Sequence, residues 1–169
     1  MEITILIFLF GGLFLGWSLG ANDAANVFGT AVGTRMVSFT SAAIVCSIFV
    51  ILGAIISGAG TTETLGKLGA INALPGAFAA CVAAGVSVYL MTKVGLPVST
   101  TQAIVGAIVG WNLYTGSSTN IQVLMTILAT WIICPIIAGI IAMGLFTFTK
   151  RVLLNRKLHI LRLDAYTRT

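Results

Sequence analysis

Long apolar runs separated by short polar stretches make up most of this chain. The main uncharged runs are residues 3–19, 39–57, 75–92 and 121–148. A helix rises 1.5 Å per residue, so about 20 apolar residues are enough to cross the hydrocarbon core of a bilayer. The pattern therefore predicts an all-α membrane protein with several spanning helices.

The first polar interruption lies within the first apolar region, at Gly20-Ala21-Asn22-Asp23-Ala24-Ala25-Asn26. It places a carboxylate and two carboxamides among apolar residues, where a lone charge is costly and usually functional. The apolar pattern then resumes and ends at Arg35. Because residues 3–34 exceed the length of a straight span, we expect a broken first helix, interrupted at residues 20–23 and facing protein or a polar cavity.

A second interruption surrounds Pro97. Proline disfavours helix at the preceding residue, and Ser99 or Thr100 suits the N-cap of a new helix running from Thr101 to about Tyr114. Two arrangements of this broken or re-entrant helix pair remain open. In one, the pair is a hairpin with its tip inside the membrane, which leaves three crossings. In the other, both helices cross, which gives five. We favour the hairpin.

Two further features concern single segments. Residues 61–74 are the most polar stretch before the C-terminal tail, and they predict a loop or interfacial segment. Within it, Glu63 and Lys67 have the four-residue spacing of an exposed helical ion pair. Gly106 and Gly110 have the spacing that allows two membrane helices to pack closely.

Composition supports the membrane class, and charge suggests an orientation. The chain is 58% hydrophobic and 8% charged, whereas soluble domains carry about a quarter charged residues. Five of the nine basic residues lie between Lys150 and Arg162, which predicts a cytoplasmic tail and does not require a nucleic-acid partner. We therefore expect residues 1–149 to form the multi-pass part in the cell (inner or plasma) membrane. Residues 150–169 are expected to be a basic cytoplasmic tail or a linker to a second half.

The break around Pro97 has the chemistry of an anion site. A helix that begins near Ser99 presents unpaired backbone N–H groups and the positive end of its dipole. Ser99, Thr100 and Thr101 add hydroxyl donors. This combination favours an oxyanion such as phosphate or sulfate.

The first interruption has the chemistry of a cation site. Asn22, Asp23 and Asn26 offer carbonyl and carboxylate oxygens, which suit a hard monovalent cation better than zinc or copper. A cation beside the anion would also offset the cost of placing Asp23 near a negative substrate.

Enzyme chemistry finds no support in the sequence. His159 is the only histidine, and it lies in the basic tail. Cys46, Cys81 and Cys134 occur singly in apolar runs, without the spacing of a metal site or a redox pair. We therefore expect no enzymatic activity, no catalytic residues and no organic cofactor.

The two polar interruptions together resemble a known family. The stretches Gly20-Ala21-Asn22-Asp23-Ala24-Ala25-Asn26-Val27-Phe28-Gly29-Thr30 and Gly95-Leu96-Pro97-Val98-Ser99-Thr100-Thr101-Gln102-Ala103-Ile104-Val105-Gly106 are similar to the motifs of the inorganic phosphate transporter (PiT) family. The resemblance extends from residue 1 to about 148. It implies secondary active symport of inorganic phosphate with sodium or protons. It also implies two inverted repeats that each carry both motifs, with the substrate between them.

Carried over by motif position, the resemblance implies a set of binding residues. Phosphate would be bound by Asp23, Ser99, Thr100 and Thr101. Sodium, as the coupling ion, would be bound by Asn22, Asp23, Asn26, Thr101 and Gln102. Many family members have histidine where this chain has Gln102, and losing that titratable group favours sodium over protons.

Each motif occurs once, so the chain resembles the N-terminal half, or first inverted repeat, of such a transporter. We expect a separate C-terminal half to complete the site, with an oligomer possible, and an antiparallel homodimer is less favoured. The alternatives are a related sulfate permease and a non-transporting structural or regulatory membrane component.

Overall fold

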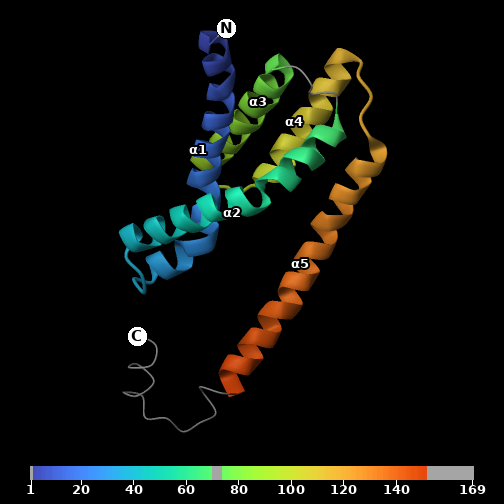
Figure 1. The fold of residues 1–169 in the computed structure, drawn as a ribbon. Coiled ribbons are helices and arrows are strands. Elements are labelled where there is room, and N and C mark those ends of the chain that lie inside the picture. Colours follow the sequence, from blue (N-terminus) through green and yellow to red (C-terminus); the bar gives the residue numbers. More distant parts are fainter. Residues whose placement is uncertain (1, 70–73, 152–169) are drawn as a thin grey trace. The chain divides into compact units, whose positions relative to one another are not determined.

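The computed structural model describes residues 2–69 and 74–151, and every regular element in those residues is a helix (Figure 1). The helices are α1 (Glu2–Gly33), α2 (Phe39–Leu68), α3 (Leu74–Lys93), α4 (Thr100–Thr115) and α5 (Ile121–Thr149). Within the described part, α1, α2, α3 and α5 are long and apolar enough to cross a membrane. The all-α membrane fold predicted from the sequence is confirmed.

The chain divides into two compact units between Leu124 and Met125, inside α5. The first unit contains α1 to α4 and the first residues of α5. The described part of the second unit is the remainder of α5, which continues through Pro135 without ending, followed by Lys150 and Arg151. Residues 152–169, most of the predicted tail, lie outside the described residues.

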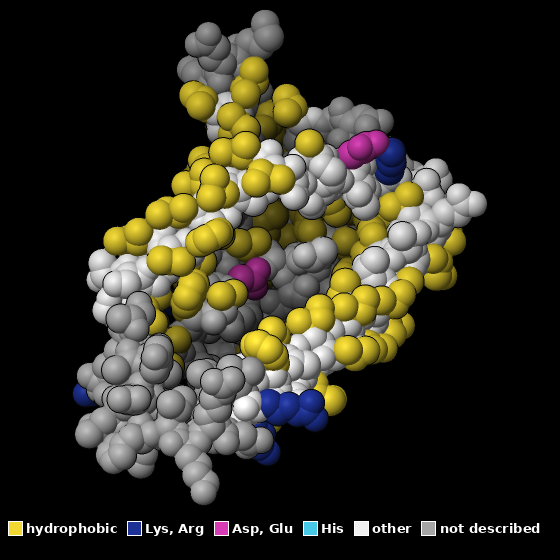
Figure 2. Space-filling view, turned by 60° about the horizontal axis from the view of Figure 1, so that its bottom comes forward, with side chains coloured by type: hydrophobic (Ala, Val, Ile, Leu, Met, Phe, Trp, Pro, Cys, Tyr) yellow, Lys and Arg dark blue, Asp and Glu magenta, His cyan; other side chains and the backbone are white. Residues whose placement is uncertain are grey.

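The surface of the described helices is strongly apolar. Figure 2 shows a face on which hydrophobic side chains dominate and charged groups are sparse. On α2, large residues such as Phe39, Ile55 and Ile56 are at least three-quarters exposed. Such exposure suits contact with lipid chains, because apolar side chains in a bilayer need not be covered by protein.

Helices α1 and α3 run parallel and pack through small residues (Figure 1). Gly11 lies against Phe78, and further along both helices Gly85 lies against Phe14. A Cβ atom added at Gly85 would be 2.7 Å from Cδ1 of Phe14, so the two helices approach as closely as glycine permits. Close approach at small residues is the usual packing mode of membrane helices.

Helices α3 and α4 flank the break at Pro97 and pack against each other. Gly76, near the start of α3, lies against the indole of Trp111, near the end of α4, so the two helices are antiparallel. Gly106 and Gly110 do not serve this contact, because among the described residues nothing lies within 4 Å of a Cβ at either position. The 16 residues of α4 correspond to about 24 Å, less than the roughly 30 Å hydrocarbon core.

The break between α3 and α4 has well-defined ends. Gly95 has a left-handed φ of 78°, which glycine adopts without steric cost. Its N–H donates to the carbonyl of Thr92, and the next N–H, of Leu96, donates to the carbonyl of Met91, both at 3.0 Å. Ser99 is the N-cap of α4 and accepts the N–H of Gln102. The predicted break around Pro97 is confirmed.

The expected break in the first helix is wrong. Helix α1 is continuous from Glu2 to Gly33 and passes through Gly20–Asp23 without interruption. A glycine inside a helix costs only about 1 kcal/mol relative to alanine. The flanking alanines favour helix, and the side chains of Asn22 and Asp23 bond to other segments instead of competing for their own backbone.

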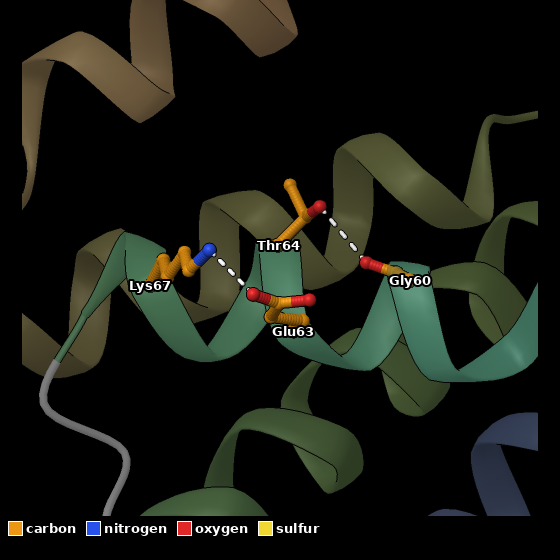
Figure 3. A network of polar contacts seen from close by, with 4 residues as sticks. All are labelled: Gly60, Glu63, Thr64 and Lys67. Carbon is orange, nitrogen blue, oxygen red and sulfur yellow. Dashed lines mark hydrogen bonds and ion pairs between the residues drawn. The ribbon is translucent and has the colours of Figure 1, made fainter.

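Of the two alternatives expected for residues 61–74, a loop or an interfacial segment, the loop is mostly wrong, because α2 continues to Leu68. The Thr64 hydroxyl donates to the carbonyl of Gly60, one turn back, at 2.9 Å (Figure 3). Glu63 and Lys67 form the predicted ion pair along the helix, with both side chains exposed (Figure 3). These local bonds accommodate polar side chains without ending the helix. Residues 70–73 lie outside the described residues.

Candidate functional site

The site centres on one turn of α1 that contacts both sides of the α3–α4 break. The Asn22 amide nitrogen donates to the Thr92 hydroxyl at 2.8 Å, at the end of α3. The Asn22 carbonyl oxygen accepts the N–H of Val98 at 3.4 Å, on the other side of the break. Asn22 is only 4% exposed. Both ends of this buried carboxamide are therefore bonded to the protein.

Asp23, the next residue of α1, contacts the start of α4. The Thr100 hydroxyl donates to the Asp23 carboxylate at 2.9 Å, and Thr100 is 6% exposed while Asp23 is half-buried. Within the described residues, Asp23 has no ion pair. The Lys93 ammonium, at the end of α3, lies over the Tyr89 ring, 5.4 Å from its centroid. The carboxylate therefore lacks a basic partner in the described part of the chain.

The first turn of α4 presents donors beside Asp23. The first N–H groups of any helix have no acceptor within the helix, and at α4 Ser99 satisfies the N–H of Gln102. The side chains of Ser99, Thr101 and Gln102 are exposed. The structure thus places three of the predicted phosphate residues, Ser99, Thr100 and Thr101, at one helix start, and the fourth, Asp23 of α1, is bonded to Thr100.

Asn26 is the predicted ligand least involved in these contacts. It lies one turn beyond Asn22 on the continuous α1, so the two share a side of the helix. Its side chain is exposed, and no hydrogen bond joins it to another described residue. Its carboxamide therefore remains available to a ligand.

Two polar residues near the site were missed in the sequence. Thr92 accepts from Asn22 and donates to the carbonyl of Val88 at 2.8 Å. Ser18 lies one turn before Asn22, is 1% exposed, and has no hydrogen-bond partner for its hydroxyl among the described residues. For Ser18 the available signal was its four-residue spacing from Asn22. For Thr92 it was only its place at the end of an apolar run.

A second polar cluster lies at the far end of α4. The fully buried Asn112 donates to the Thr119 hydroxyl at 3.0 Å. The N–H of Asn120 donates to the carbonyl of Leu68, also at 3.0 Å. These bonds connect the loop after α4 to the end of α2, and we interpret the cluster as structural.

Comparison with known proteins gives one family. The chain matches the model of the phosphate transporter family over residues 19–167. A protein of Chlamydia pneumoniae is 35% identical over 87% of this chain and 37% of its own length. One of Thermococcus kodakarensis is 34% identical over 93% of this chain and 41% of its own length. Both bear the name "Putative phosphate permease".

A third similar protein bears a more specific name. A protein of Plasmodium falciparum named a sodium-dependent phosphate transporter is 33% identical over 85% of this chain and 23% of its own length. The chain spans about two fifths of the length of the bacterial and archaeal relatives. No solved structure matches it. The family model covers most of the sequence, including the site residues of α1 and those around the α3–α4 break. The chain therefore belongs to the phosphate transporter family.

Proposed function

We propose that this chain is one half of a sodium-coupled phosphate symporter. The observation that carries the proposal is the half-buried carboxylate of Asp23. It lies at the start of α4, bonded to Thr100, and has no basic partner in the described residues. A carboxylate in this position favours a cation, and the donors around it favour an oxyanion.

Phosphate would bind at the first turn of α4. The hydroxyls of Ser99 and Thr101 and the free N–H groups of the helix start supply several donors to one small region, and the Thr100 hydroxyl could join them by giving up its bond to Asp23. A tetrahedral oxyanion accepts from such donors in several directions. Sulfate offers similar oxygens, and the family to which the chain belongs favours phosphate.

Sodium would bind between Asp23 and the phosphate. Two like charges 4 Å apart repel by about 4 kcal/mol at the effective dielectric constant of a protein surface, so a cation beside Asp23 makes phosphate binding there far more favourable. The oxygen ligands proposed for it are those of Asn22, Asp23, Asn26, Thr101 and Gln102. Sodium is favoured over protons because Gln102 does not titrate, and because one relative is named sodium-dependent.

A second half would complete the transporter. The chain spans about two fifths of its relatives' length and contains one copy of each motif. We propose an inverted second repeat, carrying its own copies of both motifs, that packs against this one in the cell membrane.

The test is uptake of labelled phosphate by proteoliposomes that contain this chain, with and without a candidate C-terminal half. An imposed sodium gradient is compared with an imposed proton gradient, and sulfate is added as a competitor. We expect sodium-driven uptake only when both halves are present, with weak competition by sulfate.

Other results would change the assignment. Equal or stronger inhibition by sulfate would indicate a sulfate permease. Uptake driven by protons alone would overturn sodium coupling. No uptake under any gradient, with both halves verified in the membrane, would indicate a non-transporting membrane component.

A further inference from the structure

We propose that Thr92 and Asn22 are a positioning pair that sets the geometry of the α3–α4 break and thereby the place of Thr100 beside Asp23. The role of the pair in transport rests on the proposed phosphate symport. Its role in fixing the break follows from the contacts alone and can be measured separately. Thr92 would act through Asn22 and would not itself bind phosphate.

The hydrogen bonds of this pair have a defined direction. The Thr92 hydroxyl gives its proton to the carbonyl of Val88, so its lone pairs face the Asn22 amide nitrogen. The Asn22 carbonyl oxygen must then face Val98, whose N–H it accepts. Rotating the carboxamide by half a turn would direct its N–H₂ at the Val98 N–H and lose that bond, and the Thr92 hydroxyl could meet the Asn22 oxygen only by giving up its own bond to Val88. Thr92, with its proton on Val88, and the Val98 N–H therefore favour the same orientation of Asn22.

The pair acts on the part of the α3–α4 break with the most backbone freedom. Residues 94–99 are outside any helix, Gly95 is in the left-handed region, and Pro97 has no N–H to donate. Val98 is bonded to α1 through Asn22, two residues before Thr100 contacts Asp23. Adjacent residues of α1 thus fix two points of the segment that leads into α4.

Loss of the Thr92 hydroxyl is expected to change both the order of the start of α4 and the binding of phosphate and sodium there. Without the Thr92 acceptor, the buried Asn22 N–H₂ group loses its partner and the carboxamide is free to turn, which releases Val98. The start of α4 then samples more positions relative to Asp23. A looser start of α4 weakens phosphate and sodium binding, because binding must first restore the geometry.

The test compares Thr92→Val, which removes the hydroxyl at nearly constant volume, with Thr92→Ser, which keeps it. Ser87→Ala is the matched control, because the Ser87 hydroxyl donates to the carbonyl of Ala83 within the same helix and forms no hydrogen bond with the described residues of α1. The full chain is reconstituted in nanodiscs for hydrogen exchange at residues 94–99. It is combined with the second half in proteoliposomes for uptake. Elution as a monodisperse protein in detergent verifies folding.

For Thr92→Val we expect exchange of the Val98 N–H to accelerate by about tenfold, as for a buried hydrogen bond that loses its partner. We also expect the phosphate KM and the sodium concentration for half-maximal uptake to rise several-fold, with little change in maximal rate. Thr92→Ser and Ser87→Ala should resemble the unaltered chain in both assays.

Hydrogen exchange tests the positioning pair, and uptake tests the proposed symport, so failure of one can be told from failure of the other. Unchanged exchange at Val98 in folded Thr92→Val would overturn the positioning pair, whatever uptake shows. Faster exchange with unchanged KM values would overturn its role in binding. If the unaltered protein shows no uptake, the symport proposal fails while exchange still decides whether the pair fixes the break. Loss of folding in Thr92→Val alone, with Thr92→Ser intact, would assign Thr92 to general packing and also overturn the proposal.

Discussion

At the scale of single residues, Asp23 determines what the site can bind. Its carboxylate is half-buried, accepts one hydroxyl, and has no basic partner among the described residues. Because no ion pair among residues 2–69 and 74–151 uses this charge, its removal should affect ligand binding more than stability.

We expect Asp23→Asn to raise the sodium concentration for half-maximal phosphate uptake at least tenfold, because the cation loses its charged ligand. The free energy of unfolding should change by only about 1 kcal/mol, since asparagine can still accept the Thr100 hydroxyl. Uptake at varied sodium, together with thermal denaturation in detergent, measures both. Glu63→Gln, which removes an exposed carboxylate on α2, is the control. Normal sodium dependence in Asp23→Asn would exclude Asp23 from the cation site.

Thr100 should determine phosphate affinity through its hydroxyl. We expect Thr100→Val to raise the phosphate KM by about tenfold or more, because it removes the hydroxyl that holds the start of α4 to the charged Asp23 carboxylate. Thr100→Ser should stay close to the unaltered chain. The measurement is uptake at varied phosphate with saturating sodium. An unchanged KM in Thr100→Val would mean that Thr100 only packs against α1.

Part of this residue-level picture was accessible from the sequence. Asn22, Asp23 and Thr100 stood out because polar groups are rare in apolar runs, and the structure brings the three together. The contact between Thr92 and Asn22 could not be predicted from the sequence. It joins residues 70 positions apart, and its partner is decided by the register between α1 and α3.

At the scale of elements, the packing of α1 on α3 sets that register. The helices meet where Gly11 and Gly85 leave space for aromatic rings of the opposite helix. Each helix is apolar around much of its circumference, so the apolar pattern alone does not select one face or one register. Small residues do, because they decide where two backbones can approach.

We expect Gly85→Val to destabilise the protein, lowering its denaturation midpoint in detergent by several degrees. The added side chain would overlap Phe14 and crowd the backbone of Leu15, and overpacking typically costs about 1–3 kcal/mol. The control is Gly106→Ala, where nothing described lies within 4 Å of the new Cβ and helix propensity improves. A midpoint for Gly85→Val equal to that of Gly106→Ala would contradict the close α1–α3 contact.

At the scale of the whole molecule, charge distribution bears on orientation in the membrane. The excess of basic residues at the C-terminal end predicts that this end is cytoplasmic. The structure contains no membrane and does not test this, so the tail orientation stays a prediction from sequence.

We expect neutralising the tail to abolish its uniform orientation. The variant replaces five basic residues by glutamine: Lys150, Arg151, Arg156, Lys157 and Arg162. A cysteine introduced at Thr167, in a background without the native cysteines, reports orientation through a membrane-impermeant maleimide. In the chain with an intact tail, labelling should require permeabilised cells, whereas the neutralised variant should be partly labelled from outside. Outside labelling with the tail intact would contradict the cytoplasmic assignment.

The sequence by itself determined the class of protein, the break at Pro97 and the polar residues of both interruptions. These follow from composition, from run length and from the covalent structure of proline, none of which depends on packing. Only the tertiary structure decided that α1 is continuous and that α2 extends to Leu68. Local preferences at glycine and polar residues amount to about 1 kcal/mol each, so neighbouring contacts outweigh them. The tertiary structure alone also joined Asn22 to Thr92 and Val98, because such a contact depends on the register of helices far apart in the chain.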